Sequence, residues 1–392
     1  MVATRNTQKY VCAECVEDSY LKRYISENST DKECTYCGEI GKKPIAITLD
    51  DLTEVIEAGM EREWSKAVDE MFHDSGEGGY QPQSAVYQTY DIVFESLEIS
   101  DNTDLLGDLV HEIGNEDWCQ RNFGGYLPDD AMKTSWETFC DIVKHKVRYL
   151  FRDFADNLAE ENMELTAPSE VMDFLGGKLL EYVTVTSLPT GTTVYRVRPH
   201  DGNTRFTLAK DLAPPPEDRA IHANRMSPAG IPMFYGSFDA ETAVAETRNP
   251  KDDFAGTVGA FSVVKELKLL DLTTLPEVPS LFDPKASERR PSLVFLRAFL
   301  RDITKPVIKD GREHIEYVPT QILTEYLRYG FSLNDGNSLD GIIYPSAVRK
   351  GFLSFVLFCE NKHCVDKNQK VDAYVLPWVQ LESVSEVCES KD

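Results

Sequence analysis

The chain has no long hydrophobic run, and no apolar stretch approaches the roughly 20 residues that a membrane-spanning helix needs. Its first 25 residues contain no continuous apolar stretch beside a cleavage-like Ala-x-Ala, so we see no secretory signal and expect a cytoplasmic protein. Internal repeats and low-complexity tails are also missing. With 42% hydrophobic and 27% charged residues, the composition excludes a wholly disordered or collagenous chain. A length of 392 residues predicts two or three domains at about 150 residues each.

Positive charge is scarce, because 41 Lys and Arg face 66 Asp and Glu and the net charge is −25. Such a protein repels phosphate backbones and anionic lipids on average, so we expect neither a nucleic acid nor a membrane as partner. Most of the excess negative charge lies in the first half of the chain. Residues 1–180 carry 37 acidic and 16 basic side chains, against 29 and 25 in the remainder. A site for an anionic small molecule is therefore expected in the second half.

The nine cysteines are an odd number, which argues against a disulfide framework. Cys12, Cys15, Cys34 and Cys37 form two C-x2-C pairs separated by 18 residues, the spacing of a four-thiolate zinc site. The segment around them has little apolar content, so bound metal would supply folding free energy that burial cannot. All four ligands would come from the protein, and we therefore predict a structural zinc in residues 1–45. The alternative is two pairs of reduced cysteines in a loop.

Helical patterns follow the cysteines. Apolar residues at three- and four-residue steps give one face from Leu52 to Phe72, and the clearest helix extends from Ser135 to Phe154. From Leu188 the pattern changes to short β-branched and aromatic runs between Pro, Gly and Asp clusters. These runs are 192–198, 256–264, 267–272, 340–346, 353–358 and 372–379, with helices between them near 240–248, 292–301 and 320–328. The sequence predicts an α+β protein, with a helical domain at 46–184 and a mixed α+β domain at 185–385.

The first of these strands contains Tyr195-Arg196-Val197-Arg198. Side chains alternate across a strand, so Arg196 and Arg198 share one face while Tyr195 and Val197 share the other. An arginine in the middle of such a strand is either a surface charge or a buried anion clamp. The residues alone leave both interpretations open.

Two further stretches carry candidate functional groups. Residues 224–248 combine Arg225 beside a Ser-Pro-Ala-Gly turn, the pair Phe234-Tyr235, and Glu246 on a helix rich in small residues. Small residues let a helix approach a sheet closely, which would bring Glu246 into a cleft, although a solvated helix carboxylate is the simpler interpretation. The strand at 340–346 ends at Ser346, and a serine at a strand end commonly forms a turn.

Taken in chain order, four motifs carry a resemblance: Tyr-Arg, then Asn-Arg-Met-x-Pro-x-Gly followed by Phe-Tyr-Gly, then Ala-x-Ala-Glu, then Asp-Gly-Ile-Ile-Tyr-Pro-Ser. Together they resemble the RES domain over about residues 185–385. The Cys-rich and helical residues before them resemble the HEPN-like domain that precedes RES in some bacterial proteins. None of the seven histidines follows an arginine at the five- to seven-residue spacing of active HEPN ribonucleases, so we do not expect RNA cleavage.

The resemblance implies a fold similar to that of ADP-ribosyltransferase toxins, and it implies degradation of NAD+. The nicotinamide–ribose bond would be cleaved with inorganic phosphate as co-substrate, or with water as acceptor. It also implies a toxin or anti-phage defence effector restrained by an antitoxin or another regulatory protein, and we expect a homo-oligomer formed through the helical or the RES domain. The residues that match the family motifs are Arg196, Glu246 and Ser346 as catalytic groups, and Tyr195, Arg225 and Tyr235 as substrate-binding groups.

The chemistry of such a site can be argued from the residue types. Breaking the nicotinamide–ribose bond develops positive charge on the sugar, which the carboxylate of Glu246 would stabilise. Guanidinium groups suit a diphosphate because they stay charged and bond two oxygens at once, which suggests Arg196 and Arg225. Two other functions remain open. One is a mono-ADP-ribosyltransferase that modifies a macromolecule, and the other is an interaction module that binds a nucleotide without consuming it.

Overall fold

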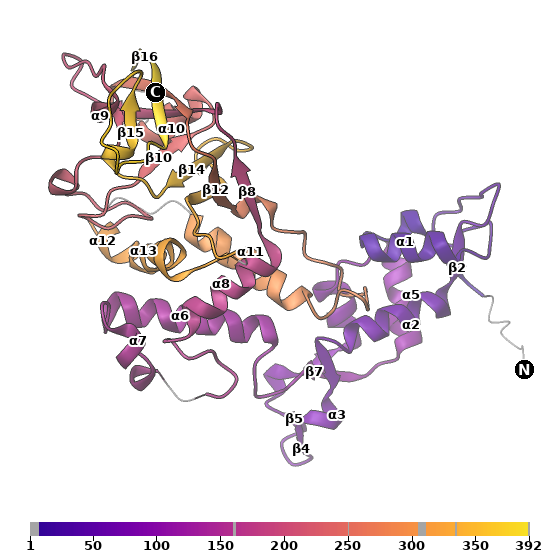
Figure 1. The fold of residues 1–392 in the computed structure, drawn as a ribbon. Coiled ribbons are helices and arrows are strands. Elements are labelled where there is room, and N and C mark those ends of the chain that lie inside the picture. The colour runs from indigo at the N-terminus through magenta and orange to yellow at the C-terminus, as the bar shows by residue number, and fades with distance from the viewer. Residues whose placement is uncertain (1–7, 160–161, 250, 305–310, 334, 391–392) are drawn as a thin grey trace, which may run out of the picture. The chain divides into compact units, whose positions relative to one another are not determined.

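The computed structural model shows a mixed helix and sheet protein, which confirms the predicted α+β class (Figure 1). The chain divides into two compact units, the first formed by residues 1–131 and 277–294 and the second by residues 132–276 and 295–392. Among the described helices, none is both long and apolar enough to cross a membrane. The structure describes residues 8–159, 162–249, 251–304, 311–333 and 335–390.

The first unit combines helices with three small β-elements. β1 pairs with β2 beside the cysteines, β3, β7 and β6 form a three-stranded sheet, and β4 and β5 form a hairpin. The helices pack through one buried cluster that includes Leu21, Leu52, Leu105 and Trp118. The bounds are β1 Tyr10–Cys12, α1 Ser19–Asn28, β2 Ala46–Thr48, α2 Leu49–Met60, β3 Trp64–Lys66, α3 Ala67–Glu70, β4 Phe72–Asp74, β5 Gly79–Gln81, β6 Tyr87–Gln88, α4 Thr89–Asp91, α5 Thr103–Ile113 and β7 Asp117–Gln120.

The apolar face predicted from Leu52 to Phe72 does not belong to one helix. α2 ends at Met60, Trp64 lies in β3, and Phe72 lies in β4 with 72% of its surface exposed. Likewise, the helix predicted from Ser135 to Phe154 is divided into α6 (Pro128–His145) and α7 (Phe151–Phe154). Val68 and Phe72 continue the three- and four-residue spacing but are 65% and 72% exposed, so periodicity alone does not locate the end of a helix.

The second unit contains helices and one large sheet. Within the part of the chain that the structure describes, this sheet has nine strands in the order β15-β16-β11-β9-β10-β14-β13-β12-β8. The strands are β8 Thr184–Leu188, β9 Thr193–Pro199, β10 Phe234–Ser237, β11 Phe254–Val263, β12 Leu267–Asp271, β13 Gly341–Pro345, β14 Leu353–Leu357, β15 Cys364–Asp366 and β16 Val379–Glu389. The helices that lie wholly or mostly in this unit are α6, α7, α8 Val171–Tyr182, α9 Ala209–Leu212, α10 Ala240–Thr247, α11 Arg290–Thr304, α12 Glu313–Glu316 and α13 Val318–Glu325.

The two faces of this sheet are covered by different clusters. Leu270, Ile342 and Val356 point into the cluster that α6, α8, α11 and α13 share. Their chain neighbours Leu269, Ile343 and Phe355 point into the cluster on the other face, which is consistent with the twofold alternation of a strand. Both faces of the central strands are therefore buried, and these strands are apolar on both sides.

The compact units do not coincide with the segments predicted from the sequence. Residues 132–184, which include α8, cluster with the sheet and not with the preceding helices. The reason is that Leu175 and Leu179 of α8 are completely or almost completely buried in the same cluster as Leu270 of β12. The boundaries at 45, 184 and 385 stay predictions.

Candidate active site

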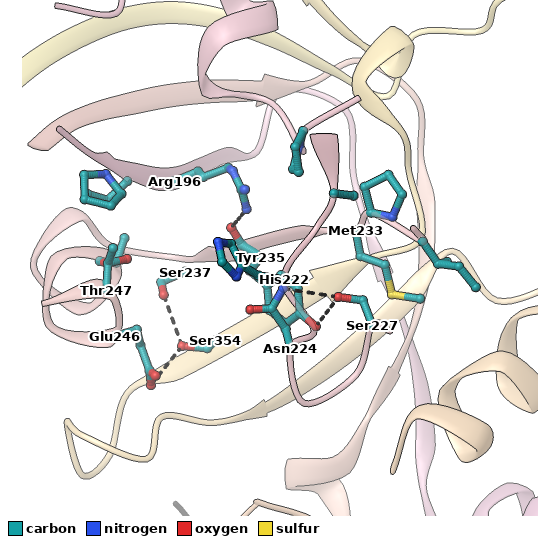
Figure 2. Close-up of a pocket in the computed structure, with 18 of the residues that line it drawn as sticks. Arg196, His222, Asn224, Ser227, Met233, Tyr235, Ser237, Glu246, Thr247 and Ser354 are labelled. Carbon is teal, nitrogen blue, oxygen red and sulfur yellow. Dashed lines mark hydrogen bonds between the residues drawn. The ribbon is translucent and has the colours of Figure 1, made fainter. Parts of the chain in front are cut away.

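A cavity of about 410 Å³ opens where β9 and β10 separate (Figure 2). β9 pairs with β11 along its whole length, and β10 pairs with β14 along its whole length. Between β9 and β10, however, the ladder is reduced to the single pair Ser237 and Tyr195. The sheet is therefore split at this point. Main-chain groups that would pair with each other in a continuous ladder do not do so here. A cavity of this size is within the range of ligand-binding sites in proteins.

Arg196 reaches this split from β9. Its Nε donates to the carbonyl oxygen of Leu212 and its Nη1 to that of Tyr235, both at 2.8 Å. Its guanidinium also lies 5.2 Å from the centre of the Phe234 ring. The second bond replaces part of the missing ladder between β9 and β10. Burial lowers the pKa of Arg196 from its ordinary value, but nothing near neutral pH discharges a guanidinium.

Glu246 lines the same cavity from α10. Its Oε1 accepts hydrogen bonds from the hydroxyl of Ser346 at 2.5 Å and from the main-chain N–H of Ala347 at 3.1 Å. The hydroxyl of Ser354 lies 3.5 Å from the same oxygen. Among the described residues, none donates a hydrogen bond to Oε2. One oxygen of the carboxylate is thus held by the protein, while the other is available to a ligand.

Ser346 holds Glu246 and does not line the cavity. It is only 9% exposed, and its hydroxyl oxygen accepts from the N–H groups of Val348 at 3.3 Å and Arg349 at 3.0 Å. With its proton directed at Glu246, the hydroxyl makes the one donor and two acceptor bonds that a serine can make. The structure therefore brings Glu246 and Ser346 together, but directs Ser346 to the carboxylate and not to a ligand.

Of the two tyrosines expected at the site, the structure places only Tyr235 at the cavity. Tyr235 lines the cavity, and its hydroxyl accepts from the N–H of Met226 at 3.2 Å and lies 3.1 Å from the hydroxyl of Ser227. Burial raises the pKa of Tyr235 to about 12. Tyr195 is not among the residues lining the cavity and packs instead against the cluster that contains Val197 and Val244.

Arg225 is not among the residues that line the cavity. Its Nη1 donates to the carbonyl of Ile303 at 2.7 Å, and its side chain borders a separate hollow of about 110 Å³. Its neighbours Asn224 and Ser227 do line the cavity (Figure 2). The loop thus directs residues of one motif to different places, and membership of the motif did not reveal which side chain faces the cavity.

Sequence reasoning missed several lining residues, above all Ser237 and Ser354. Their hydroxyls lie 3.1 Å apart, both side chains are buried, and Ser354 connects the pair to Glu246 (Figure 2). His222 also lines the cavity. The available signal was the strand alternation itself, because Ser237 follows Tyr235 by two residues and therefore points to the same face.

The charged groups of the cavity are few. Among its described lining residues, Arg196 supplies a cation, Glu246 supplies an anion, and His222 supplies an imidazole ring. Tyr344 lies beneath them, where burial together with the neighbouring Tyr235 and Glu246 raises its pKa. The tyrosine hydroxyls therefore stay neutral at physiological pH. The site can bind a ligand that carries both a negative group and a position where positive charge develops.

A second constellation lies in the first unit, where the sulfur atoms of Cys12, Cys15, Cys34 and Cys37 are all within 4.8 Å of one another. The Sγ–Sγ distances are 3.8 Å between Cys12 and Cys15, 3.5 Å between Cys12 and Cys37, and 3.6 Å between Cys15 and Cys34. Tetrahedral zinc with bonds of about 2.3 Å separates its sulfurs by about 3.8 Å. The cluster is thus compatible with the predicted structural zinc.

The second cysteine pair has the local geometry of a zinc knuckle. Gly38 follows Cys37 with φ of 72°, a conformation that favours glycine, and its N–H donates to the carbonyl of Cys34 at 3.0 Å. Burial opposes ionisation of Cys34, but main-chain N–H groups of Cys37, Cys12 and Tyr36 outweigh it and lower the pKa of Cys34 to about 7. Such N–H bonds stabilise a thiolate, which is the form that binds metal.

Comparison with known families gives two matches. Residues 27–157 match HEPN/RES N-terminal domain 1, and residues 193–379 match the RES domain. The second match contains every residue that lines the cavity. No curated protein and no solved structure matches the chain.

Proposed function

Since the chain belongs to the family that joins a HEPN/RES N-terminal domain to a RES domain, we propose that it is an enzyme that degrades NAD+ by cleaving the nicotinamide–ribose bond. RES domains have NAD+-related, toxin-like activity at the level of the family. The bond that is cleaved, the acceptor and the residue roles are our proposal for this chain.

One observation carries the proposal most directly: the carboxylate of Glu246 is held on the wall of the cavity by Ser346 and Ala347, with Oε2 left for a ligand. A carboxylate fixed in this way does not have to reorganise when charge develops nearby. Arg196 lines the same cavity and supplies the opposite charge. The substrate that suits this pair has an anionic group and a sugar carbon that becomes cationic, and NAD+ has both.

The reaction would proceed by loss of nicotinamide. The bond between the ribose C1′ and the nicotinamide nitrogen breaks, its electron pair goes to the nitrogen, and the pyridinium becomes neutral nicotinamide. Positive charge remains on the ribose, as in glycoside hydrolysis. Oε2 of Glu246 would lie beside this charge. At 4 Å such a pair is worth about 4 kcal/mol at an effective dielectric of about 20, against about 1 kcal/mol in water.

Arg196 would bind the diphosphate through the guanidinium edge that does not contact the carbonyls of Leu212 and Tyr235. Arg225 was expected to share this role, but its bond to Ile303 directs it elsewhere in the present geometry. We therefore assign the anionic group of the substrate to Arg196, with His222 as a second donor that lines the same cavity.

The acceptor proposed for the ribose is inorganic phosphate. One phosphate oxygen would form the new bond to C1′, which yields ADP-ribose-1″-phosphate, and water would instead yield ADP-ribose. The resemblance to characterised RES domains supports phosphate. We further propose that this activity serves as a toxin or defence effector, that a partner protein restrains it, and that the zinc-containing domain contributes to that restraint or to oligomerisation.

The test is a mass spectrum of NAD+ after incubation with the full chain, with and without phosphate. Appearance of nicotinamide together with ADP-ribose-1″-phosphate supports phosphorolysis, whereas ADP-ribose indicates hydrolysis. Label from NAD+ on a macromolecule would instead support a transferase, and unchanged NAD+ in every condition would contradict the proposal.

The matched variants are Glu246→Gln and Glu241→Gln, because both residues lie on α10 and undergo the same chemical change. Glu246→Gln removes the charge from the cavity and should lower turnover by on the order of 100- to 1000-fold. The carboxylate of Glu241 is 83% exposed and pairs with Arg349, so its variant should retain most of the activity. Equal activity of the two variants would remove Glu246 from the mechanism.

A further inference from the structure

Arg349 connects the turn after β13 to the first turn of α10. Its Nη1 donates to Oδ1 of Asp239 and to the hydroxyl of Thr242, both at 2.8 Å, and its Nη2 donates to Glu241 at 2.8 Å. Asp239 is the N-cap of α10 and also accepts the main-chain N–H of Thr242 at 2.8 Å. Arg349 is therefore bonded to the N-cap and to two residues of the first turn.

The opposite end of α10 is bonded to the same turn. Glu246 lies in the last turn of the helix, and its Oε1 accepts from Ser346 and Ala347. Residues 346–349 thus hold an eight-residue helix, about 12 Å long, at both of its ends. An isolated helix of this length is unstable in water, so tertiary contacts must determine where it lies.

The turn at residues 346–349 is held by hydrogen bonds and a ring contact of its own. The hydroxyl of Ser346 accepts from the N–H of Arg349, and the N–H of Ser346 donates to the carbonyl of Phe352 at 2.9 Å. The guanidinium of Arg349 lies 4.0 Å from the centre of the Phe352 ring, which limits the directions that the side chain can take. The turn can therefore hold α10 in one orientation.

We propose that Arg349 is a positioning residue of this site, which holds α10 at the orientation that keeps the Glu246 carboxylate on Ser346 and at the cavity wall. Arg349 is not among the described residues that line the cavity, so it acts through Glu246 and not on the substrate. This inference rests on the proposed function. A displacement of about 1 Å in a reacting group can lower a rate by about 100-fold, which is why a bond at the far end of the helix affects turnover.

If Arg349 only stabilised the fold through its ion pairs, its loss would affect folding and not the position of Glu246. Glu241 is largely exposed, and exposed pairs contribute little to stability. Asp239 still accepts the main-chain N–H of Thr242 and caps α10 when the guanidinium is lost, so the helix should still form. Loss of Arg349 should thus affect the position of Glu246 more than the folding of the chain.

The experiment compares Arg349→Gln and Arg349→Lys with Arg152→Gln, which removes a surface pair with Asp173 elsewhere in the same unit. We expect Arg349→Gln to lower kcat by about 10- to 100-fold with KM changed less than about threefold. Arg349→Lys should be intermediate, because a lysine keeps the charge but not the bonds to two partners. Arg152→Gln should retain the kcat of the original chain. An unchanged kcat in Arg349→Gln, or a change confined to KM, would overturn the proposal.

Two further measurements separate positioning from other effects. If Arg349 acts only through Glu246, the double variant Arg349→Gln, Glu246→Gln should be no slower than Glu246→Gln alone, and additive losses would contradict the proposal. Should Arg349→Gln fail to fold, Asp239→Asn removes the charge of one partner but keeps a good cap, so a smaller loss in kcat is expected and an unchanged kcat would contradict the proposal.

A crystal structure of Arg349→Gln tests positioning without any activity. The carboxylate of Glu246 should leave the hydroxyl of Ser346, and retention of that bond would overturn the positioning role. If the original chain leaves NAD+ intact under every condition while the carboxylate still moves in the variant, the proposed function fails and the positioning role does not.

Discussion

The guanidinium of Arg196 donates a hydrogen bond from Nη1 to the main-chain carbonyl of Tyr235, 2.8 Å away, at the point where β9 and β10 separate. The side chain of Arg196 thus donates the hydrogen bond that the main chain of a paired strand would donate in a continuous sheet. The same group borders the cavity, so one residue contributes both to the structure of the split and to the positive charge of the site.

We expect Arg196→Lys to lose both stability and activity. A lysine cannot make directed bonds to the carbonyls of Leu212 and Tyr235 together, and leaving a buried acceptor unpaired should lower the free energy of unfolding by on the order of 2 kcal/mol. Urea unfolding and NAD+ consumption measure the two effects. Arg198→Lys, on the same strand, is the control and should change both much less. Equal stability of the two variants would show that the bonds of Arg196 are replaceable.

Ser346→Ala should impair turnover while leaving substrate binding nearly intact. The variant removes the hydroxyl that donates to Glu246 and that accepts from the N–H of Arg349, so the carboxylate loses its shortest bond. We expect kcat to fall by about 10- to 100-fold with little change in KM. Steady-state kinetics with NAD+ provide the measurement, and Ser187→Ala, at an exposed strand position, provides the control. A direct role of Ser346 in binding would appear as a raised KM.

Gly236→Ala should destabilise the second unit. A Cβ at this position would lie 2.8 Å from the carbonyl oxygen of Tyr195 and 2.6 Å from the ring of Phe355, and the carbonyl is part of a strand that cannot move freely. Overpacking of this kind costs about 1–3 kcal/mol. The control is Gly177→Ala in α8, where a Cβ meets nothing within 4 Å and should instead stabilise by about 0.5–1 kcal/mol. Thermal unfolding of the two variants should therefore shift in opposite directions.

Tyr235→Phe should make the protein less sensitive to alkaline pH. Burial raises the pKa of Tyr235 to about 12, against an ordinary value of 10.0. Between these values the unfolded chain has lost the proton while the folded chain keeps it, so stability falls as pH rises from about 10 to about 12. The variant removes this contribution and should show a shallower decline in the free energy of unfolding over that range. Tyr374→Phe, which is 97% exposed, should decline like the original chain.

Removal of one cysteine ligand should release zinc and destabilise the first unit. Elemental analysis of the purified chain should find one zinc per molecule, and Cys15→Ser should contain much less, because a hydroxyl is a poor substitute for a thiolate. A chelator should lower the melting temperature of the original chain by the same mechanism. Cys388→Ser removes an exposed thiol outside the cluster and should keep its zinc. A chain that binds no zinc when intact would contradict the prediction.

Local patterns were sufficient for some elements and insufficient for others. The strand around Arg196 and the helix that carries Glu246 lie where alternation and small residues predicted them. The run at 372–379, in contrast, is not a strand until its last residue, Val379, where β16 begins. Tyr374 and Leu376 before that point are 97% and 60% exposed, and a sequence pattern does not distinguish exposed apolar residues from residues of a buried strand.

The sequence by itself determined the family, the α+β class and the four-cysteine cluster, because each depends on residue types at short, regular spacings. Only the tertiary structure decided which candidates meet. Glu246 and Ser346 are 100 residues apart in the chain, yet share a hydrogen bond, whereas Arg225 and Tyr195 belong to the motifs and do not line the cavity. The physical reason is that the cavity is formed by the separation of two strands, and neither strand encodes that separation alone. It arises from how β9 pairs with β11 and β10 with β14.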